Sequence, residues 1–218
     1  MQTRTVAEWR KILKLSYKNK GISISGIKTD ESVLVIPEKI GEKEVFEIDA
    51  YAFRACKSLT SITLPKTVKR IGCGAFFACS NLSTVVVESE DISIEPDAFR
   101  NCPGLADKNG FVIIKNVLYN YYGSEPHVNV PEGVVDLGQC VFSFNKNIKS
   151  ISLPTTINAL SDFILTLGEN LEDVYIPKSV KYFGRGVFNK CKNVKIHAPI
   201  GSVAEDYAKD NDITFIAE

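Results

Sequence analysis

Residues 52–76, AFRACKSLTSITLPKTVKRIGCGAF, begin and end on the same Ala-Phe pair, so that Phe53 and Phe76 lie 23 residues apart. An apolar residue recurs at intervals of 23, 23, 43, 23 and 23 residues, at Phe53, Phe76, Phe99, Phe142, Leu165 and Phe188. Self-similarity at a fixed period of this length is typical of repeat proteins, in which each unit forms one turn of chain. The sequence therefore predicts a stack of similar coils.

Three further repeat positions recur at the same spacing, and the set of residues at one repeat position is called a column below. A cysteine or a small polar residue follows the aromatic position by three residues, at Cys56, Cys79, Cys102, Asn145, Gly168 and Cys191. A turn-forming residue follows by five, at Ser58, Asn81, Gly104, Asn147, Asn170 and Asn193, and an aliphatic residue by six, at Leu59, Leu82, Leu105, Ile148, Leu171 and Val194. Because Ser, Asn and Gly adopt or locally satisfy a tight or left-handed backbone, we expect a bend at the turn column of every unit.

A short alternating segment that ends at proline comes next in most units, at residues 33–37, 61–65, 128–131, 150–154 and 173–177. Side chains alternate along a strand, so Ile62 and Leu64 are predicted to point to one face. Proline lacks the amide that would continue the ladder and closes each strand; Glu88 takes its place in the third unit. A second extended piece, with Val68 and Ile71, then leads to the next aromatic residue.

The division into segments follows from these patterns. Residues 1–30 are predicted to be an N-terminal cap, with a short helix because Thr5 and Glu8 have capping-box spacing. A hairpin is predicted to follow, because apolar residues alternate at 13–17 and 22–24 on either side of KNKG. Residues 31–198 are predicted to form the repeat array. Residues 199–218 are predicted to be a C-terminal cap, a helix followed by a strand.

The C-terminal helix and the insertion carry more detailed predictions. In the C-terminal helix, Ser202 is the expected N-cap, and Val203, Tyr207 and Ala208 are expected on one face. The 43-residue interval contains an insertion at about 107–126, whose central Lys-Asn pair predicts a hairpin that projects from the array.

The pattern of Ala and Phe, then Cys, then Leu, then IxLP resembles the BspA-like leucine-rich repeat, a family of bacterial surface and host-associated proteins. The resemblance runs from about Ile24 to the end of the chain. It implies a right-handed leucine-rich-repeat solenoid that is mainly β, with parallel stacked strands, short helical or irregular turns and short helical end caps. Glu88, Leu165, Asn145 and Gly168 depart from the family pattern.

The six cysteines allow disulfides, a metal site or buried thiols. Equivalent positions in neighbouring coils are separated by the strand spacing of roughly 4.8 Å, whereas a disulfide requires Cβ atoms about 3.8 Å apart, so a column of buried thiols is favoured. The chain has no Cys-x-x-Cys pair, and its two histidines, His127 and His197, belong to different units. We therefore expect no metal and no cofactor.

Composition and motifs exclude other function classes. The 26 basic and 26 acidic residues cancel without forming a long run of one sign, which argues against nucleic acid as a partner. No segment approaches the about 18 consecutive apolar residues of a membrane span, and the first twenty residues lack an apolar signal region. The chain has no G-x-S-x-G, phosphate-loop or H-E-x-x-H motif, so no enzyme activity is predicted.

The remaining feature is a surface. Residues that flank the inward strand positions are predicted to point outward as a mostly small, uncharged ladder: Val33, Val35, Ser61, Thr63, Thr84, Val86, His127, Asn129, Ser150, Ser152, Asp173 and Tyr175. A second candidate patch is the insertion, with Tyr119, Tyr121 and Tyr122, although alternation is expected to bury some of these rings.

The sequence thus predicts a non-catalytic, monomeric scaffold that binds a protein or glycan through the strand face, or else a spacer that presents another domain. The family resemblance implies adhesion at the cell surface or secretion. Six cysteines without an evident pairing are also compatible with a reducing cytoplasm.

Overall fold

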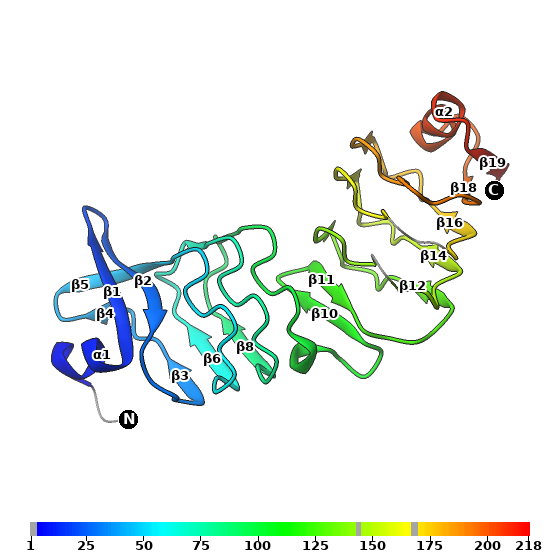
Figure 1. Ribbon diagram of the computed structural model, residues 1–218. Coiled ribbons are helices and arrows are strands. Elements are labelled where there is room, and N and C mark those ends of the chain that lie inside the picture. Colours follow the sequence, from blue (N-terminus) through cyan, green and yellow to red (C-terminus); the bar gives the residue numbers. More distant parts are fainter. Residues whose placement is uncertain (1–3, 143–144, 167–169) are drawn as a thin grey trace. The chain divides into compact units, whose positions relative to one another are not determined.

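The computed structural model describes residues 4–142, 145–166 and 170–218, and contacts divide the chain into two compact units, Met1–Ala106 and Asp107–Glu218 (Figure 1). The first unit contains, in order, α1 (Val6–Ile12), β1 (Leu13–Lys18), β2 (Gly21–Ile27), β3 (Val33–Val35), β4 (Lys39–Ile40), β5 (Lys43–Ile48), β6 (Ser61–Leu64), β7 (Arg70–Ile71), β8 (Thr84–Val87), β9 (Ser93–Ile94) and the 3-10 helix η1 (Pro103–Leu105). The second contains β10 (Phe111–Ile114), β11 (Val117–Tyr121), β12 (His127–Asn129), β13 (Asp136–Leu137), β14 (Ser150–Ser152), β15 (Ala159–Leu160), β16 (Asp173–Tyr175), β17 (Tyr182–Phe183), β18 (Lys195–Ala198), α2 (Val203–Asp210) and β19 (Thr214–Ala217).

The strands that end near proline form a parallel ladder in each unit. In the first unit β6 lies between β3 and β8, and in the second the order is β12, β14, β16, β18 and β19 (Figure 1). Register follows the repeat, because Ile62 pairs with Leu34 and Val85. Glu88, which has the amide that proline lacks, donates it to the Leu64 carbonyl at 3.0 Å. The predicted stack of parallel strands is confirmed.

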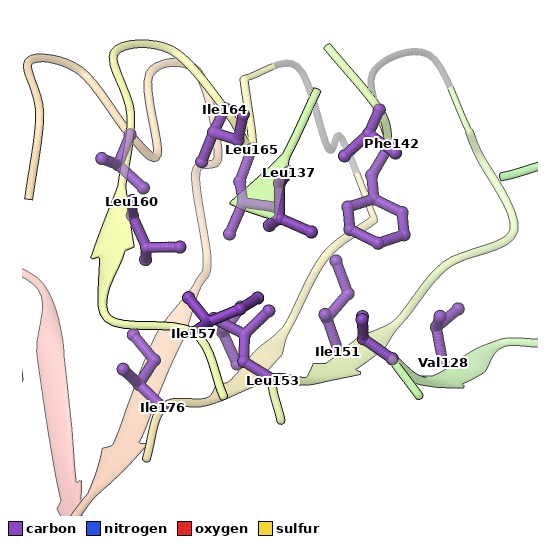
Figure 2. Close-up of a cluster of buried hydrophobic side chains, with 14 of the residues drawn as sticks. Val128, Leu137, Phe142, Ile151, Leu153, Ile157, Leu160, Ile164, Leu165 and Ile176 are labelled. Carbon is purple, nitrogen blue, oxygen red and sulfur yellow. The ribbon is translucent and has the colours of Figure 1, made fainter. Parts of the chain in front are cut away.

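The second extended pieces of the coils form ladders of their own. In the first unit β7 pairs in parallel with β5 and β9, and in the second β15 pairs in parallel with β17. Each coil therefore carries two short strands joined by turns, and its apolar side chains point into the space between them. Figure 2 shows this interior in the second unit, with Ile151 and Leu153 facing Leu160 and Leu165.

The aromatic column lies inside the first unit as a row of stacked rings. The ring centroids of Phe53 and Phe76 are 5.1 Å apart at an interplanar angle of 2°, and those of Phe76 and Phe99 are 5.1 Å apart at 3°. All three side chains are buried. In the second unit the equivalent residues Phe142, Leu165 and Phe188 are buried as well. The expected internal row of apolar residues is confirmed.

The turns around the aromatic column form a third ladder, and here the prediction was partly wrong. The left-handed backbone lies two residues before and two residues after the aromatic position, as at Tyr51 and Ala55 around Phe53. The amides of these three residues donate to the next coil, at 2.7–3.0 Å, to the carbonyls of Cys73, Ala75 and Phe77. Residues as different as Tyr51, Gly74 and Ala55 take this backbone, so residue type alone does not set the left-handed positions.

The turn column that we expected to be left-handed has a different role. Its residues have no positive φ, but the Nδ2 of Asn81 donates to the Lys57 carbonyl at 2.7 Å, and that of Asn170 to the Lys146 carbonyl at 2.7 Å. At Gly104 a Cβ atom would lie 2.6 Å from the Leu82 carbonyl oxygen, so this turn requires close backbone approach. The bend is confirmed, but Asn recurs there because its amide joins successive coils. Gly168, which stands at the cysteine position of its coil, lies outside the described residues.

The cysteine column also joins coils. The thiol of Cys79 donates to the Phe53 carbonyl at 2.9 Å, that of Cys102 to the Phe76 carbonyl at 3.0 Å and that of Cys191 to the Leu165 carbonyl at 3.1 Å. All six cysteines are free thiols. The neighbouring Cys102 thiol, together with burial, raises the pKa of Cys79 well above its ordinary value, which keeps this thiol protonated.

The terminal segments contain the predicted elements. Helix α1 has the expected capping box, in which Thr5 and Glu8 bond to each other's backbone amides, and β1 and β2 form the hairpin. Helix α2 has Ser202 as its N-cap, as predicted. Its inner face was predicted correctly at Ala208, which is buried, and at Tyr207, which packs on Phe183. The prediction was wrong at Val203, which is 38% exposed, and the inner face contains Ala204 instead.

The insertion is a hairpin of β10 and β11, and its tip residues Lys115 and Asn116 both have positive φ, as a tight hairpin turn requires. It does not project from the array. Strand β11 pairs in parallel with β13, and Phe111 and Leu118 are buried in the core of the second unit. The alternation of apolar residues that predicted a hairpin also gives it an inward face, which the unit buries.

Candidate binding surface

The outward residues of the strand ladders have the predicted orientation. All twelve are exposed or partly exposed, whereas the residues between them, such as Leu34, Ile62 and Ile151, are buried. The ladder is not a single sheet, because β3, β6 and β8 belong to one sheet and β12, β14 and β16 to another. Each unit therefore has a strand face of its own.

The strand face of the first unit is apolar and β-branched. Val33, Val35 and Val86 are 57%, 44% and 43% exposed. Register places Thr63 between Val35 and Val86, and Ser61 between Val33 and Thr84. The surface offers methyl groups and hydroxyls without a formal charge.

The strand face of the second unit is polar and its side chains bond to one another. One row contains His127, Ser150 and Asp173 in register, and the Nδ1 of His127 lies 2.8 Å from the Ser150 hydroxyl. The adjacent row contains Asn129, Ser152 and Tyr175.

A charged cluster at one end of this face was missed by the sequence analysis. Strand β18 extends the rows with Lys195 and His197. The Nε2 of His197 lies 2.8 Å from Asp173 Oδ1, its Nδ1 lies 3.0 Å from Glu218 Oε1, and its ring stacks on Tyr175 at a centroid distance of 4.3 Å. The segment KIHAP has the strand-then-proline pattern and could have signalled this continuation. The expectation of an uncharged ladder is therefore wrong for the second unit.

The His127 and Ser150 pair does not have the arrangement of a nucleophilic triad. In a triad the histidine lies between the nucleophile and the carboxylate that orients its ring. Here Ser150 is the middle residue of its row, and Asp173 accepts from His197 instead. The geometry is that of a hydrogen-bonded polar surface.

The three tyrosines of the insertion do not form one exposed patch. Tyr119 and Tyr121 are 4% and 7% exposed, whereas Tyr122 is 41% exposed. Burial raises the pKa of Tyr119 far above its ordinary value. Tyr121 packs between Phe111 and Phe142, with ring centroids 4.9 and 6.0 Å away. These two tyrosines contribute to the core, so the proposed patch is corrected to Tyr122 alone.

Within residues 4–142, 145–166 and 170–218, no three His, Cys, Asp or Glu side chains gather closely enough to hold a metal ion. In the same ranges no helix has the length and apolar character needed to span a bilayer.

The comparisons with known proteins agree with the repeat pattern. A family model described as a BspA type leucine rich repeat region matches residues 34–109 and 112–205, with six copies of the repeat. Among solved structures, the fold is similar to a leucine-rich repeat protein of T. pallidum, with 24% identity, a TM-score of 0.59 and coverage of 95% of this chain and 98% of the other. A leucine-rich repeat protein of Bacteroides ovatus has 18% identity and a TM-score of 0.50, with coverage of 94% and 75%. No protein with a curated description matches significantly.

Proposed function

Because the chain belongs to the BspA-type leucine-rich-repeat family, a family of repeat scaffolds, we propose that it is a non-catalytic recognition module that binds a protein or glycan through its strand faces. The observation that carries this proposal is the in-register array of outward side chains on β12, β14 and β16. The buried strand residues fix the backbone of this array, so binding would require little ordering of the surface.

The two faces favour different contacts. The exposed valines of the first unit suit an apolar partner surface, whereas the second unit presents hydroxyl, amide and imidazole groups that suit hydrogen bonding. Tyr175, which is 38% exposed, is the large aromatic residue of that second face and the best candidate for a binding hot spot.

The test is a triple variant, Thr63→Glu, Ser152→Glu and Tyr175→Glu, which places three carboxylates on the strand faces. The matched control places the same three charges elsewhere, by Val135→Glu, Tyr182→Glu and Ile200→Glu, at positions 46%, 59% and 73% exposed. We expect the wild type and the control to capture the same ligand from host extracellular proteins or a glycan array, and the strand-face variant to lose it. Unchanged capture by the strand-face variant would refute the proposal.

The alternative function is a spacer that presents another domain and has no ligand of its own. It predicts that the wild type captures nothing above the level of the strand-face variant in either assay. Location at the cell surface or secretion is proposed from the family, with the cytoplasm as the alternative. Fractionation of cells that express the full gene, followed by detection with antibody, distinguishes these compartments.

A further inference from the structure

A pocket of about 750 Å³ opens on the first unit away from the strand face. Its lining comes from the end of β1 and the following turn, from β5, and from the segment that leads into β7 (Figure 1, where β1 and β5 lie in the blue part of the chain). None of the strand-face residues lines it. Nothing in the proposed function uses this pocket.

The floor of the pocket is an ion-pair network in which two cations, Lys18 and Arg70, face the three carboxylates of Glu47, Asp49 and Glu95. Glu47, whose side chain is 9% exposed, bonds to Arg70 and lies 2.7 Å from Lys18 Nζ. Lys18 also bonds to Asp49 at 2.8 Å, and Arg70 to Glu95 at 3.2 Å. The hydrogen bonds to Asp49 and Glu47 raise the pKa of Lys18, so it stays charged. Lys18 and Arg70 are thus held by protein carboxylates.

Three other lysines at the pocket are loosely held. Lys66 pairs with Glu38 at 3.1 Å with side chains 71% and 47% exposed, and Lys69 lies 3.9 Å from Asp91, whose side chain is 99% exposed. Such exposed pairs are weak because water screens both charges, so a ligand anion can replace them. Lys20 is exposed and has no ion pair within the part of the chain that the structure describes. Among the described lining residues outside the floor network, Glu44 is the one carboxylate that opposes these cations.

One wall is the ring of Phe46, which is half-buried and lies 6.0 Å from Lys18 Nζ. The backbone of Gly21 fixes the neighbouring space, because a Cβ there would lie 3.3 Å from the Phe46 ring and 2.4 Å from the Glu44 carbonyl oxygen. The pocket therefore combines a positioned aromatic face with available cations. Its volume is within the range of about 300–1,000 Å³ that is usual for small-ligand sites.

We propose that this pocket binds an acidic sugar residue of a glycan, with the sugar ring against Phe46 and its carboxylate or sulfate near Lys20, Lys66 and Lys69. The C–H groups of a sugar ring suit the negative face of an aromatic ring. Lysine is a mobile point charge that serves either anion without the planar pairing of arginine. An extended peptide would instead add to a sheet edge, but β5 is paired with both β2 and β7.

The experiment is calorimetric titration of the full chain with three tetrasaccharides. These are hyaluronan, which carries carboxylates, chondroitin sulfate, which carries sulfates as well, and neutral N-acetylglucosamine. We expect one or both acidic sugars to bind, more weakly as salt is raised, and the neutral sugar not to bind. Preference for chondroitin sulfate over hyaluronan identifies sulfate as the anion recognised, and equal binding identifies the carboxylate.

Substitutions in the pocket test whether the acidic sugar binds there. Lys20→Gln, Lys66→Gln and Lys69→Gln together should weaken it about tenfold or more, the equivalent of about 1.4 kcal/mol. Lys108→Gln, Lys146→Gln and Lys178→Gln change the net charge equally in the other unit and should leave it unchanged. Phe46→Leu should weaken binding severalfold, and Phe46→Tyr, which keeps the ring, should retain it. Thermal unfolding of every variant checks that it is folded.

Three results would overturn the proposal. The first is no binding of either acidic sugar. The second is an equal loss in the two lysine triples, which would show attraction by net charge alone. The third is displacement of the sugar by an acidic peptide that binds more tightly, which would assign the pocket to peptides. None of these outcomes depends on the strand-face variants, so this site and the proposed function can fail separately.

Discussion

The two units fill the same repeat position in different ways. In the first unit Phe53, Phe76 and Phe99 form a column of nearly parallel rings 5.1 Å apart, whereas in the second unit Leu165 occupies the position between Phe142 and Phe188. Both units keep the coil spacing and bury these side chains. The fold therefore requires an apolar side chain of suitable length at this position, and ring stacking is an addition to that requirement.

The hairpins of the two units show the opposite relation, because their structures are similar although their sequences are unrelated. Each unit has an antiparallel hairpin near its start, β1–β2 directly after α1 in the first and β10–β11 in the second. In both, the second strand of the hairpin pairs in parallel with a second-piece strand, β5 or β13. An exposed first coil would leave apolar side chains in water, and a hairpin covers them in each unit.

The largest expected effect compares the two aromatic columns. Phe76→Ala removes the middle ring of the stack, which is fully buried, and should lower the free energy of unfolding by about 3–5 kcal/mol. Phe188→Ala should cost less, because that residue is 6% exposed and lies near the C-terminal helix. Urea denaturation followed by circular dichroism measures both. Equal losses of unfolding free energy in the two variants would show that ring stacking adds no stability beyond burial.

An effect of intermediate size should be the same in both units. Asn81→Ala and Asn170→Ala each remove a 2.7 Å hydrogen bond between coils, and each should cost about 0.5–1.5 kcal/mol. The exposed Asn158, whose side chain makes no such bond to the described residues, provides the control, and its change to Ala should stay within about 0.5 kcal/mol. Different losses at Asn81 and Asn170 would mean that the asparagine column is not equivalent between units.

The smallest effect is a gain. Ala78 and Lys190 hold the same left-handed position after the aromatic residue, in different units, at φ values of 61° and 67°. Glycine adopts this conformation without strain, so Ala78→Gly and Lys190→Gly should each raise the free energy of unfolding by about 0.5 kcal/mol. Ala75→Gly, at a buried position without positive φ, should lower it. Thermal melting distinguishes the expected gain in stability at Ala78 and Lys190 from the expected loss at Ala75. Destabilisation by Ala78→Gly would contradict the left-handed role assigned to this turn residue.

The period, the strands and the inward face of each coil could be predicted from the sequence, because they depend on residue type at fixed spacing. Phe76 and Ile62 lie where the repeat places them. The left-handed positions could not be predicted, since Tyr51 and Ala55 have no local preference for that conformation and take it to bond with the next coil. The same holds for β11, whose partner β13 is chosen by packing in space.

The candidate surfaces were predicted less completely than the core. Alternation was enough to place Ser152 and Tyr175 outward. It could not show that His197 would bridge Asp173 and Glu218, because that contact joins residues from three separate parts of the chain. The pocket at Phe46 was missed for the same reason, since its lysines come from separate segments.

The turn ladder of the first unit has a consequence for how such genes change in length. The amides of Tyr51, Phe53 and Ala55 meet the carbonyls of the following coil, and those of Gly74, Phe76 and Ala78 do the same one coil later. Each of these coils therefore presents backbone amides and carbonyls to its neighbours at equivalent positions of the repeat. A duplication or deletion of one whole repeat in the DNA would leave matching backbone partners on either side, so recombination can lengthen or shorten the array without altering any remaining residue.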